Sequence, residues 1–237
     1  MRIEWHGPVL LLIGEEAYVA FTNLRHTDVV TEVAKQTATL RRLGLPTEWK
    51  VYGHDFPQDL GEQLGKMGYV PDPPETLMVY DLANGIPSMP GDMEGVEIRQ
   101  IMDRKGLVDA AEVSEKGPGE PEAVQPVRFE HRLNDPTLAY FAAYVGSRPV
   151  SVGRLEMPAG RAFASLWGGS TTPAYRHRGI YRALVHIRAK RAHDRGFRYL
   201  TVDARETSQP ILARLGFAPV TSVRGWLLSP PSPGRQG

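Results

Sequence analysis

A short basic turn, residues 171–181 (TTPAYRHRGIY), joins a strand-like stretch to a helix-like one. Upstream, residues 162–167 (AFASLW) predict a strand, and downstream the apolar residues recur at helical spacing. A helix start offers unpaired backbone N–H groups and the positive end of the helix dipole. Gly179 lets a ligand approach the backbone, and Arg176 and Arg178 add positive charge. The turn is a candidate site for an oxyanion, with phosphate the best match; a solvent-facing basic turn is the alternative.

The elements predicted after this turn make its interpretation more specific. The helix is expected to end at Arg195-Gly196, and residues 197–204 (FRYLTVDA) predict the next strand. A short helix from Ser208 to Leu215 then ends at Gly216-Phe217. The order strand, basic turn, helix, strand, short helix, Gly-Phe resembles the GNAT superfamily of acetyl-CoA-dependent N-acetyltransferases. The resemblance covers roughly the last 140 residues, and its specificity lies in the order of the parts.

The resemblance implies a mixed α/β fold, an α+β mixed sheet of the GNAT acyl-CoA N-acyltransferase type, with acetyl-CoA as co-substrate. In that family the turn holds the pyrophosphate of coenzyme A, and backbone N–H groups at the end of the preceding strand bind the pantetheine and the thioester oxygen. Gly168-Gly169 would mark the bulge that separates this strand from its neighbour. The residues implied to bind the coenzyme are Ser170, Thr171, Thr172, Arg176, His177, Arg178, Gly179, Ile180 and Tyr181.

The chain departs from the family pattern at two positions. Tyr181 is the sixth residue of the turn, where the family prefers Gly or Ala, so the backbone is expected to approach the phosphates less closely there. The family's usual general acid is a Tyr four residues before Gly216, and this chain has Leu212 at that place. Residues 208–212 (SQPIL) look like a variant of this helix found in some members. The candidate substitutes for the missing acid, which could equally be packing residues, are Tyr175, Tyr181 and Tyr199.

Two residues, Glu156 and Ser208, are predicted to act in catalysis. Glu156 lies near the end of a predicted hairpin strand, where a carboxylate could deprotonate the incoming ammonium directly or through water. Ser208 could hold the coenzyme or a water, and a helix cap is its alternative role. Asp203 and Glu206 are further candidates for the base, because they follow the next strand at its C-terminal end. For each carboxylate, an exposed or hydrogen-bonded structural role is the alternative.

Composition narrows the classes of function. The net charge of +1 argues against general nucleic-acid or membrane binding. The absence of cysteine excludes disulfides, thiolate catalysis and cysteine-ligated zinc. The apolar run 8–13 is too short to span a bilayer and predicts a buried strand, so we expect a cytoplasmic protein. His186 and His193 have no third ligand nearby in sequence, and no metal is predicted.

The helix after the turn is rich in basic residues. They could contact the adenosine 3′-phosphate of the coenzyme, although we expect a solvated helix face. These residues are Arg182, His186, Arg188, Lys190, Arg191, His193 and Arg195.

The first third of the chain predicts a similar order of elements. Residues 17–22 and 49–52 predict strands on either side of a helix that is capped by Thr27 or Asp28. A helix, a Gly-aromatic pair and a strand follow, as they do near the C-terminus. We interpret this as a truncated GNAT-like half before a complete GNAT domain; a chance likeness between α/β segments is the alternative. The turn at 21–28 lacks Arg-x-x-Gly, so we expect no coenzyme there and a structural role instead.

The predicted division has four parts. Residues 1–84 form the degenerate GNAT-like domain, 85–94 a linker, 95–228 the acetyltransferase domain and 229–237 a disordered tail. The linker and the tail are rich in Gly and Pro or Ser, which break both helix and strand. Within the second domain, residues 124–133 predict a helical segment that either covers the acceptor side of the site or is a surface loop.

The sequence therefore predicts an acetyl-CoA-dependent N-acetyltransferase that acts on a primary amine by direct attack. A non-catalytic acyl-CoA-binding or sensing protein is the main alternative, because the usual acid Tyr is absent. A third reading, an RNA or anion site without acyl chemistry, is disfavoured by the balanced charge. The acceptor, a small-molecule or peptide amine, is open, as is the choice between monomer and homodimer.

Overall fold

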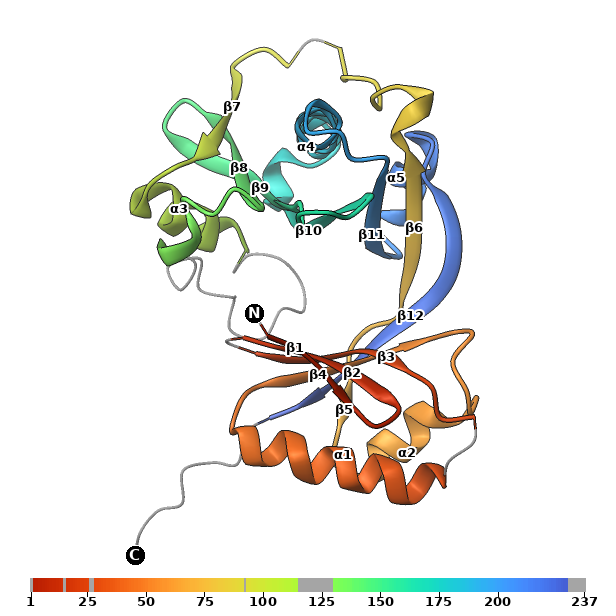
Figure 1. Ribbon diagram of the computed structural model, residues 1–237. Helices are drawn as coiled ribbons and strands as arrows, with labels where there is room; N and C mark the ends of the chain where they lie inside the picture. The colour runs from red at the N-terminus through yellow and green to blue at the C-terminus, as the bar shows by residue number, and fades with distance from the viewer. Residues whose placement is uncertain (1, 15, 26–27, 92, 115–129, 230–237) are drawn as a thin grey trace, which may run out of the picture. The chain divides into compact units, whose positions relative to one another are not determined.

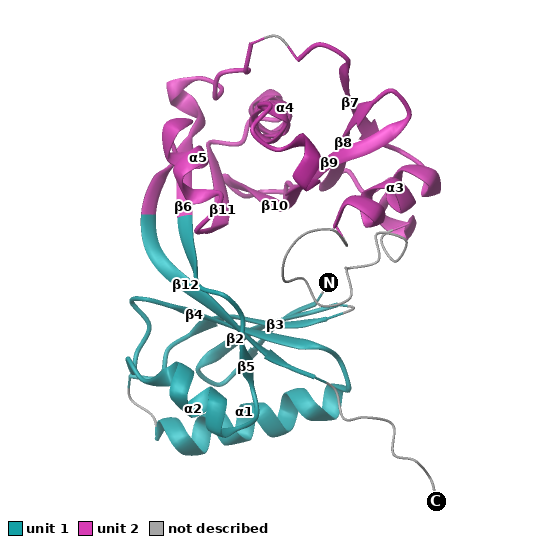
Figure 2. Cartoon of the chain, turned by 180° about the vertical axis from the view of Figure 1, so that it is seen from behind, with its two compact units in different colours: residues 1–77, 220–237 teal, residues 78–219 magenta. Residues whose placement is uncertain are grey.

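The computed structural model describes residues 2–14, 16–25, 28–91, 93–114 and 130–229. The chain divides into two compact units (Figure 2): unit 1 comprises residues 1–77 and 220–237, and unit 2 comprises residues 78–219. Strand β6 (Glu75–Asp81) begins in unit 1 and ends in unit 2, whereas strand β12 (Ala218–Leu228) begins in unit 2 and ends in unit 1.

Unit 1 is a sheet with two helices, α1 and α2, on one face (Figure 1). The strand order is β1-β2-β3-β4-β12, with β5 beside β12. Strands β3 and β4 are parallel because α1 connects them, and the other pairs are antiparallel. The elements are β1 (Arg2–His6), β2 (Val9–Ile13), β3 (Ala17–Thr22), α1 (Val29–Leu43), β4 (Thr47–Tyr52), α2 (Leu60–Lys66) and β5 (Val70–Pro71).

The core of unit 1 follows from strand and helix periodicity. In β2, buried residues alternate with half-buried ones, so one face of the strand points to the helices. In α1, the buried residues Val33, Thr37 and Leu40 recur at three- and four-residue spacing. These faces enclose Trp49, which is fully buried on β4.

Unit 2 has the strand order β6-β11-β10-β9-β8-β7. Strands β7 to β10 pair antiparallel in turn, and β10 pairs with β11 in parallel because helix α4 connects them. The elements are β7 (Val96–Ile101), α3 (Arg104–Ser114), β8 (Leu138–Val145), β9 (Arg148–Glu156), β10 (Phe163–Thr171), α4 (Ile180–Asp194), β11 (Tyr199–Arg205) and α5 (Gln209–Arg214). Two short 3-10 helices, η1 (Leu82–Asn84) and η3 (Pro173–Tyr175), complete it.

The two faces of the unit 2 sheet pack against different helices. On β8, Ala139 and Phe141 belong to the core that α4 and α5 cover. The alternate residues Tyr140 and Ala142 belong to a separate core under α3. Because neighbouring strand residues point to opposite faces, α3 lies on the other side of the sheet from α4, as Figure 1 shows.

Most predicted elements are present with ends shifted by one or two residues. The sequence did not predict β1, whose side chains are largely exposed. The predicted helical segment 124–133 falls mainly outside the described residues, and 130–132 form a 3-10 turn. Of the predicted tail, residues 230–237 also lie outside them. The compact units are discontinuous, unlike the predicted division, because β6 lies beside β11 and β12 pairs with β4.

Candidate active site

The basic turn is fastened to the sheet at its first residues. The Thr172 backbone N–H donates to the Val150 carbonyl oxygen at 2.9 Å, which extends the β9–β10 pairing by one residue. The Arg176 guanidinium Nε then donates back to the Thr171 carbonyl oxygen at 3.0 Å. His177 has a φ of 61°, a left-handed conformation that is uncommon for a residue other than glycine. The turn therefore has a defined backbone path from β10 to α4.

Gly179 is the N-cap residue of α4 and adopts a left-handed conformation, with φ 79° and ψ −6°. No side chain caps this helix, and the first intrahelical bond runs from the Ala183 N–H to the Gly179 carbonyl oxygen at 3.0 Å. The N–H groups of the first turn consequently have no acceptor within the helix. Together with the positive end of the dipole, they can bind an anion.

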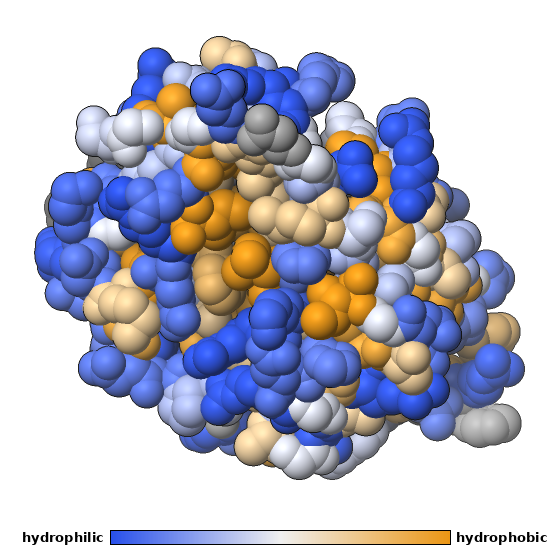
Figure 3. Space-filling model, turned by 90° about the horizontal axis from the view of Figure 1, so that it is seen from above, coloured by the Kyte–Doolittle hydropathy of each residue, from blue (hydrophilic) through white to orange (hydrophobic). Residues whose placement is uncertain are grey.

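Arginine side chains surround the uncapped helix start. Arg176 and Arg178 are exposed, and the Arg178 guanidinium lies over the Tyr175 ring at 5.3 Å. The Arg148 guanidinium lies 5.9 Å from the same ring. Figure 3, which views the molecule from above Figure 1, shows a largely hydrophilic surface with apolar patches between the charged residues.

The segment predicted to be a linker packs on this helix. A Cβ added to Gly179 would lie 3.1 Å from the Pro90 side chain. One ring nitrogen of His186, Nδ1, is 2.7 Å from the Pro87 carbonyl oxygen. Residues 85–91 thus contact α4 at its first residues and again near its middle.

Strand β10 is bulged, as the two adjacent glycines predicted. Its register with β9 shifts between Trp167 and Ser170, and Gly168 has a left-handed φ of 55°. The bulge lies opposite Gly153 of β9, because Trp167 pairs with Arg154 on one side of it.

Strands β10 and β11 part beyond their first residues. Their parallel pairing in the described chain covers Phe163–Ser165 and Tyr199–Thr201. The Tyr181 ring lies beside the unpaired part of β10, 2.8 Å from where a Cβ on Gly169 would stand. The Tyr181 hydroxyl is hydrogen-bonded to the Ser208 side chain, which follows β11.

Ser208 and Leu212, the two candidate positions at α5, differ in hydrogen bonding and burial. Ser208 is the N-cap of α5, but its hydroxyl does not cap that helix and donates instead to the Arg205 carbonyl oxygen at 3.1 Å. Leu212 is fully buried in the core under α4 and α5. The place of the family's usual acid is therefore part of the core, whereas Ser208 contacts the half-buried phenol of Tyr181.

The basic face of α4 is not fully solvated, contrary to the prediction from the sequence. Arg188 is 1% exposed and lies on the apolar face of the helix, eight residues after Ile180. Its Nε donates to the Leu184 carbonyl oxygen at 3.0 Å. Its Nη1 donates to the carbonyl oxygens of Arg154 and Trp167, at 3.2 and 3.4 Å. The helical spacing from Ile180 was the signal that could have identified Arg188 as buried.

Arg188 and Tyr181 perturb each other's ionisation. Burial lowers the pKa of Arg188 to about 10, and the neighbouring Tyr181 opposes this shift. Burial raises the pKa of Tyr181, while Arg188 and the interaction with the Ser208 side chain act in the opposite direction. The phenol therefore stays protonated at neutral pH beside a buried guanidinium.

Glu156 lies apart from the turn, on the sheet face opposite α4. Glu156 pairs with Ser165 of β10, and Ser165 in turn pairs with Thr201 of β11. The hydroxyl oxygens of Ser165 and Thr201 are 2.9 Å apart. Its Oε1 is 3.2 Å from Nε of Arg154, whose guanidinium lies 5.8 Å from the Trp167 ring. We call these five residues, Arg154, Glu156, Ser165, Trp167 and Thr201, the polar rows.

The predicted site residues form two groups. Residues 170–181 and Ser208 are brought together by the turn and by the Tyr181 hydrogen bond. Glu156 is paired with Ser165, six residues before Thr171, which corresponds to roughly 20 Å of strand. The polar rows extend toward the first group through Trp167, next to the bulge.

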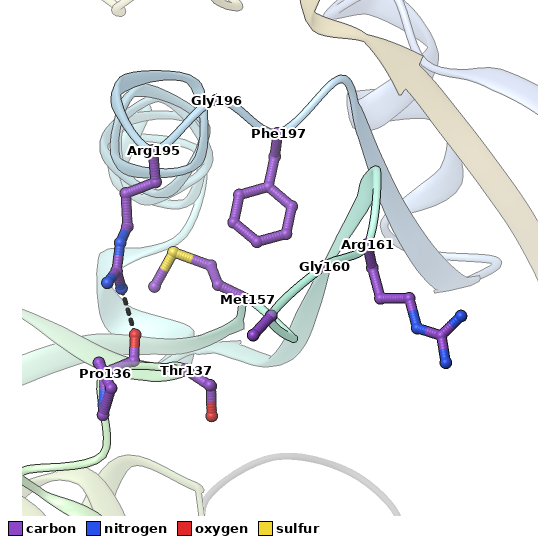
Figure 4. A pocket seen from close by; sticks show the side chains of 9 residues that line it. Pro136, Thr137, Met157, Gly160, Arg161, Arg195, Gly196 and Phe197 are labelled. Carbon is purple, nitrogen blue, oxygen red and sulfur yellow. Dashed lines mark hydrogen bonds between the residues drawn. The ribbon is translucent and has the colours of Figure 1, made fainter.

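A separate pocket of about 270 Å³ lies at the other end of the same strands (Figure 4). Phe197 and Met157 form its apolar wall, and the Arg195 guanidinium donates to the Pro136 carbonyl oxygen at its side. Among the described residues that line it, none is predicted to act in catalysis or to bind the coenzyme pyrophosphate or pantetheine. This pocket is therefore distinct from the turn and the bulge.

The turn, the bulge and the parted strands lie within a segment that matches a known family. Residues 109–225 match the family model of the acetyltransferase (GNAT) domain. This segment, just under half of the chain, is similar to the GNAT acetyltransferase domain. The matched segment runs from within α3 into β12, and it includes every residue predicted to bind the coenzyme, as well as Glu156 and Ser208.

Solved GNAT structures share the fold over nearly the whole chain. A GCN5-related N-acetyltransferase from Kribbella flavida has a TM-score of 0.66 at 16% identity, covering 98% of this chain and 90% of its own. A GCN5-related N-acetyltransferase from Sphaerobacter thermophilus has 0.65 at 14% identity, covering 93% and 76%. A tandem GNAT protein from the clavulanic acid biosynthesis pathway has 0.58 at 16% identity, covering 93% and 78%. The predicted fold class is confirmed.

The search of curated proteins gave no match. Within the described ranges, no helix is long and apolar enough to cross a membrane. In the same part of the chain, no group of three His, Asp or Glu side chains is placed to hold a metal ion.

Proposed function

We propose that this chain is an acetyl-CoA-dependent N-acetyltransferase that moves an acetyl group to a primary amine by direct attack. One observation supports this above the others: an uncapped helix N-terminus at Gly179 directly follows a bulged strand that has parted from its parallel neighbour. The helix start offers N–H groups to an anion, and the parted strands leave backbone groups for an extended ligand.

The residues of the turn have distinct parts in this proposal. The N–H groups of residues 176–181 and the exposed Arg176 and Arg178 bind the pyrophosphate of acetyl-CoA. The backbone at 170–172 lies along the pantetheine, held in place by Ser151, whose Oγ donates to the Ser170 carbonyl oxygen at 2.7 Å. Acetyl-CoA is a co-substrate here, consumed in each turnover.

The polar rows are proposed to receive the acceptor. The amine must lose a proton before its nitrogen attacks the thioester carbon. Glu156 is the proposed base, because it is a half-buried carboxylate on the same sheet face as Trp167, next to the bulge. Ser208 is proposed to act at the coenzyme through its contact with Tyr181. As the nitrogen–carbon bond forms, the carbon–sulfur bond breaks and coenzyme A leaves as a thiol.

We also propose that residues 1–84 are a degenerate GNAT-like half that precedes the complete domain at 95–228. In each unit a helix connects two parallel strands, β3–α1–β4 and β10–α4–β11, and a short helix follows. In unit 1 the Asp28 carboxylate caps α1, so a negative charge already stands where a phosphate would bind. A solved structure of similar fold is described as a tandem GNAT protein.

A non-catalytic acyl-CoA-binding protein is the second candidate. The burial of Leu212 at the place of the family's usual acid favours it, because that position cannot donate a proton. The two candidates share the coenzyme site and differ only in turnover.

Release of coenzyme A thiol from acetyl-CoA, measured with a thiol reagent across a panel of primary amines, separates them. The chain has no cysteine, so the reagent reports coenzyme A alone. An enzyme releases thiol with at least one amine, and Glu156→Gln is expected to slow this by about 100-fold or more. Glu97→Gln is the matched control, because it disrupts a similar Arg–Glu pair on β7. Acetyl-CoA binding without release with any amine would favour the second candidate, and no binding would refute both.

A further inference from the structure

Two glycines on neighbouring strands make room for two large polar side chains. A Cβ on Gly153 would lie 2.7 Å from the Arg188 guanidinium carbon. A Cβ on Gly169 would lie 2.8 Å from the Tyr181 ring and 3.7 Å from Nη2 of Arg188. The Tyr181 ring and the Arg188 guanidinium therefore meet at the bulge of β10, where any larger residue would displace them.

Arg188 is a buried cation without a carboxylate partner. Its hydrogen bonds go to three backbone carbonyl oxygens, and none of the ion pairs in the described part of the chain includes it. The titratable group that acts on its charge is the Tyr181 phenol. A buried charge is costly unless it is compensated, so this position would favour any negative charge that forms nearby.

Acyl transfer from a thioester creates such a charge. When the amine nitrogen bonds to the acetyl carbon, the carbon–sulfur bond breaks and its electron pair stays on sulfur. Because a thiol has a pKa near 8.5, the leaving group at neutral pH needs a proton or a strong hydrogen-bond donor. A protonated phenol beside a cation supplies both.

We propose that the Tyr181 hydroxyl is the group that protonates the departing sulfur of coenzyme A, with Arg188 as the positioning residue behind it. This inference rests on the proposed function. The phenol gives its proton to sulfur, which becomes the neutral thiol. The phenolate then regains a proton from solvent, and Glu156 releases to solvent the proton that it took from the acceptor amine. Arg188 stabilises the transient negative charge, and Ser208 holds the phenol oxygen at the start of α5.

The other candidate residues are placed elsewhere. Leu212 is buried in the core and has no proton to give. Tyr175 lies in the turn with Arg148 and Arg178 over its ring. Tyr199 stacks on Phe163 at 4.8 Å, at the end of β11 where the strands are still paired. Tyr181 alone of these residues contacts the bulge.

The test uses coenzyme A itself as the probe and needs no acceptor. Thiolate absorbance is measured against pH as the difference between complexes with coenzyme A and with desulfo-coenzyme A, which lacks the sulfur. The subtraction removes the tyrosines, and the chain has no cysteine. Next to the bulge of β10, helix α4 contributes Tyr181 and Arg188, and Ser208 lies at the start of α5. Strands β9 and β10 contribute Gly153 and Gly169 there.

We expect the bound thiol to ionise about one pH unit below free coenzyme A, a tenfold shift, because a donor and a cation stabilise the thiolate. Tyr181→Phe, which keeps the ring, should remove most of this shift without changing affinity at a pH where the thiol is neutral. Arg188→Met should reduce it as well. Tyr199→Phe is the matched control and should behave like the native chain.

Two outcomes would overturn the inference in distinguishable ways. If the native chain binds coenzyme A and Tyr181→Phe leaves the ionisation of the bound thiol unchanged, the assignment of Tyr181 is wrong while the proposed function stands. If the native chain binds neither coenzyme A nor the desulfo form, the proposed function fails and the inference fails with it.

Discussion

Asp28 and Gly179 are the N-cap residues of the two helices that connect parallel strands, α1 and α4, but only Asp28 caps its helix with a side chain. The Asp28 carboxylate accepts from the Thr31 backbone N–H at 3.3 Å and from the Thr31 hydroxyl at 2.9 Å. At Gly179 no side chain takes this place. The two units thus use the same helix position differently, one filled by the chain's own anion and one open to an external anion.

The Asp28 cap should make unit 1 sensitive to acid. Hydrogen bonds from Thr31 lower the pKa of this carboxyl. The stabilisation is therefore complete above the unfolded pKa of about 3.9 and is lost as pH falls through the lower folded value. Asp28→Ala should lower the thermal unfolding temperature at pH 7 and have less effect at pH 3. Asp28→Asn, whose side chain can cap the helix but does not titrate, should make the unfolding temperature less dependent on pH. If Asp28→Ala lowers the unfolding temperature equally at both pH values, the ionised carboxylate does not act as the cap.

Gly179 and Gly196 allow the cost of backbone strain to be separated from that of crowding. They lie at the two ends of α4 with nearly equal φ, 79° and 80°. A Cβ at Gly196 would meet nothing within 4 Å, whereas one at Gly179 would lie 3.1 Å from Pro90. Gly196→Ala should cost about 1 kcal/mol of unfolding free energy, from the left-handed backbone alone. Gly179→Ala should cost more in the same urea titration, and equal costs would show that Pro90 does not crowd this position.

Tyr144 should make the protein sensitive to alkali. Its hydroxyl donates to Asp109 Oδ2 at 2.9 Å, and burial, with this carboxylate, raises the pKa of Tyr144 to about 12. The stabilisation is complete below the unfolded pKa of about 10 and is lost as pH rises toward 12. Tyr144→Phe should lose roughly 1–3 kcal/mol at pH 8 and show a shallower fall in stability between pH 10 and 12. If stability falls as steeply between pH 10 and 12 in Tyr144→Phe as in the native chain, this role is refuted. The part of the fall that remains in Tyr144→Phe is attributed to other buried tyrosines.

The order of elements in unit 2 was predictable because each boundary has a local cause. Gly196 ends α4 and Gly216 ends α5, both with a left-handed φ. The adjacent glycines 168 and 169 predicted the bulge, since residues without a Cβ tolerate that backbone. Local rules of this kind act over a few residues, so a sequence contains them in full.

Long-range pairing was not predictable in the same way. Strand β6 lies beside β11, more than a hundred residues later, and no local feature of the sequence indicates this pairing. Likewise, the Gly and Pro content of 85–91 excluded helix and strand without revealing that Pro90 packs against Gly179. Pairing partners and loop packing depend on tertiary contacts that propensity does not encode.

The basic turn of the candidate site was predicted from the sequence, whereas the buried position of Arg188 behind it was not. Residues 171–181 were identified from charge and Gly179, which are local features. Arg188 was assigned to solvent by its charge, although its spacing from Ile180 places it on the buried face. Its burial depends on the space left by Gly153, a contact between α4 and β9 that the sequence does not reveal.

Calorimetric titration with acetyl-CoA measures whether the start of α4 binds the coenzyme phosphates. The native chain, Arg178→Glu and Arg191→Glu should be compared at one salt concentration, since both substitutions reverse an exposed charge next to or within α4. If the helix start binds the coenzyme phosphates, the native chain binds acetyl-CoA, Arg178→Glu weakens binding at least tenfold, about 1.4 kcal/mol, and Arg191→Glu, in the last turn, stays close to native. Equal effects of the two substitutions, or no binding by the native chain, would show that the start of α4 is not the coenzyme site.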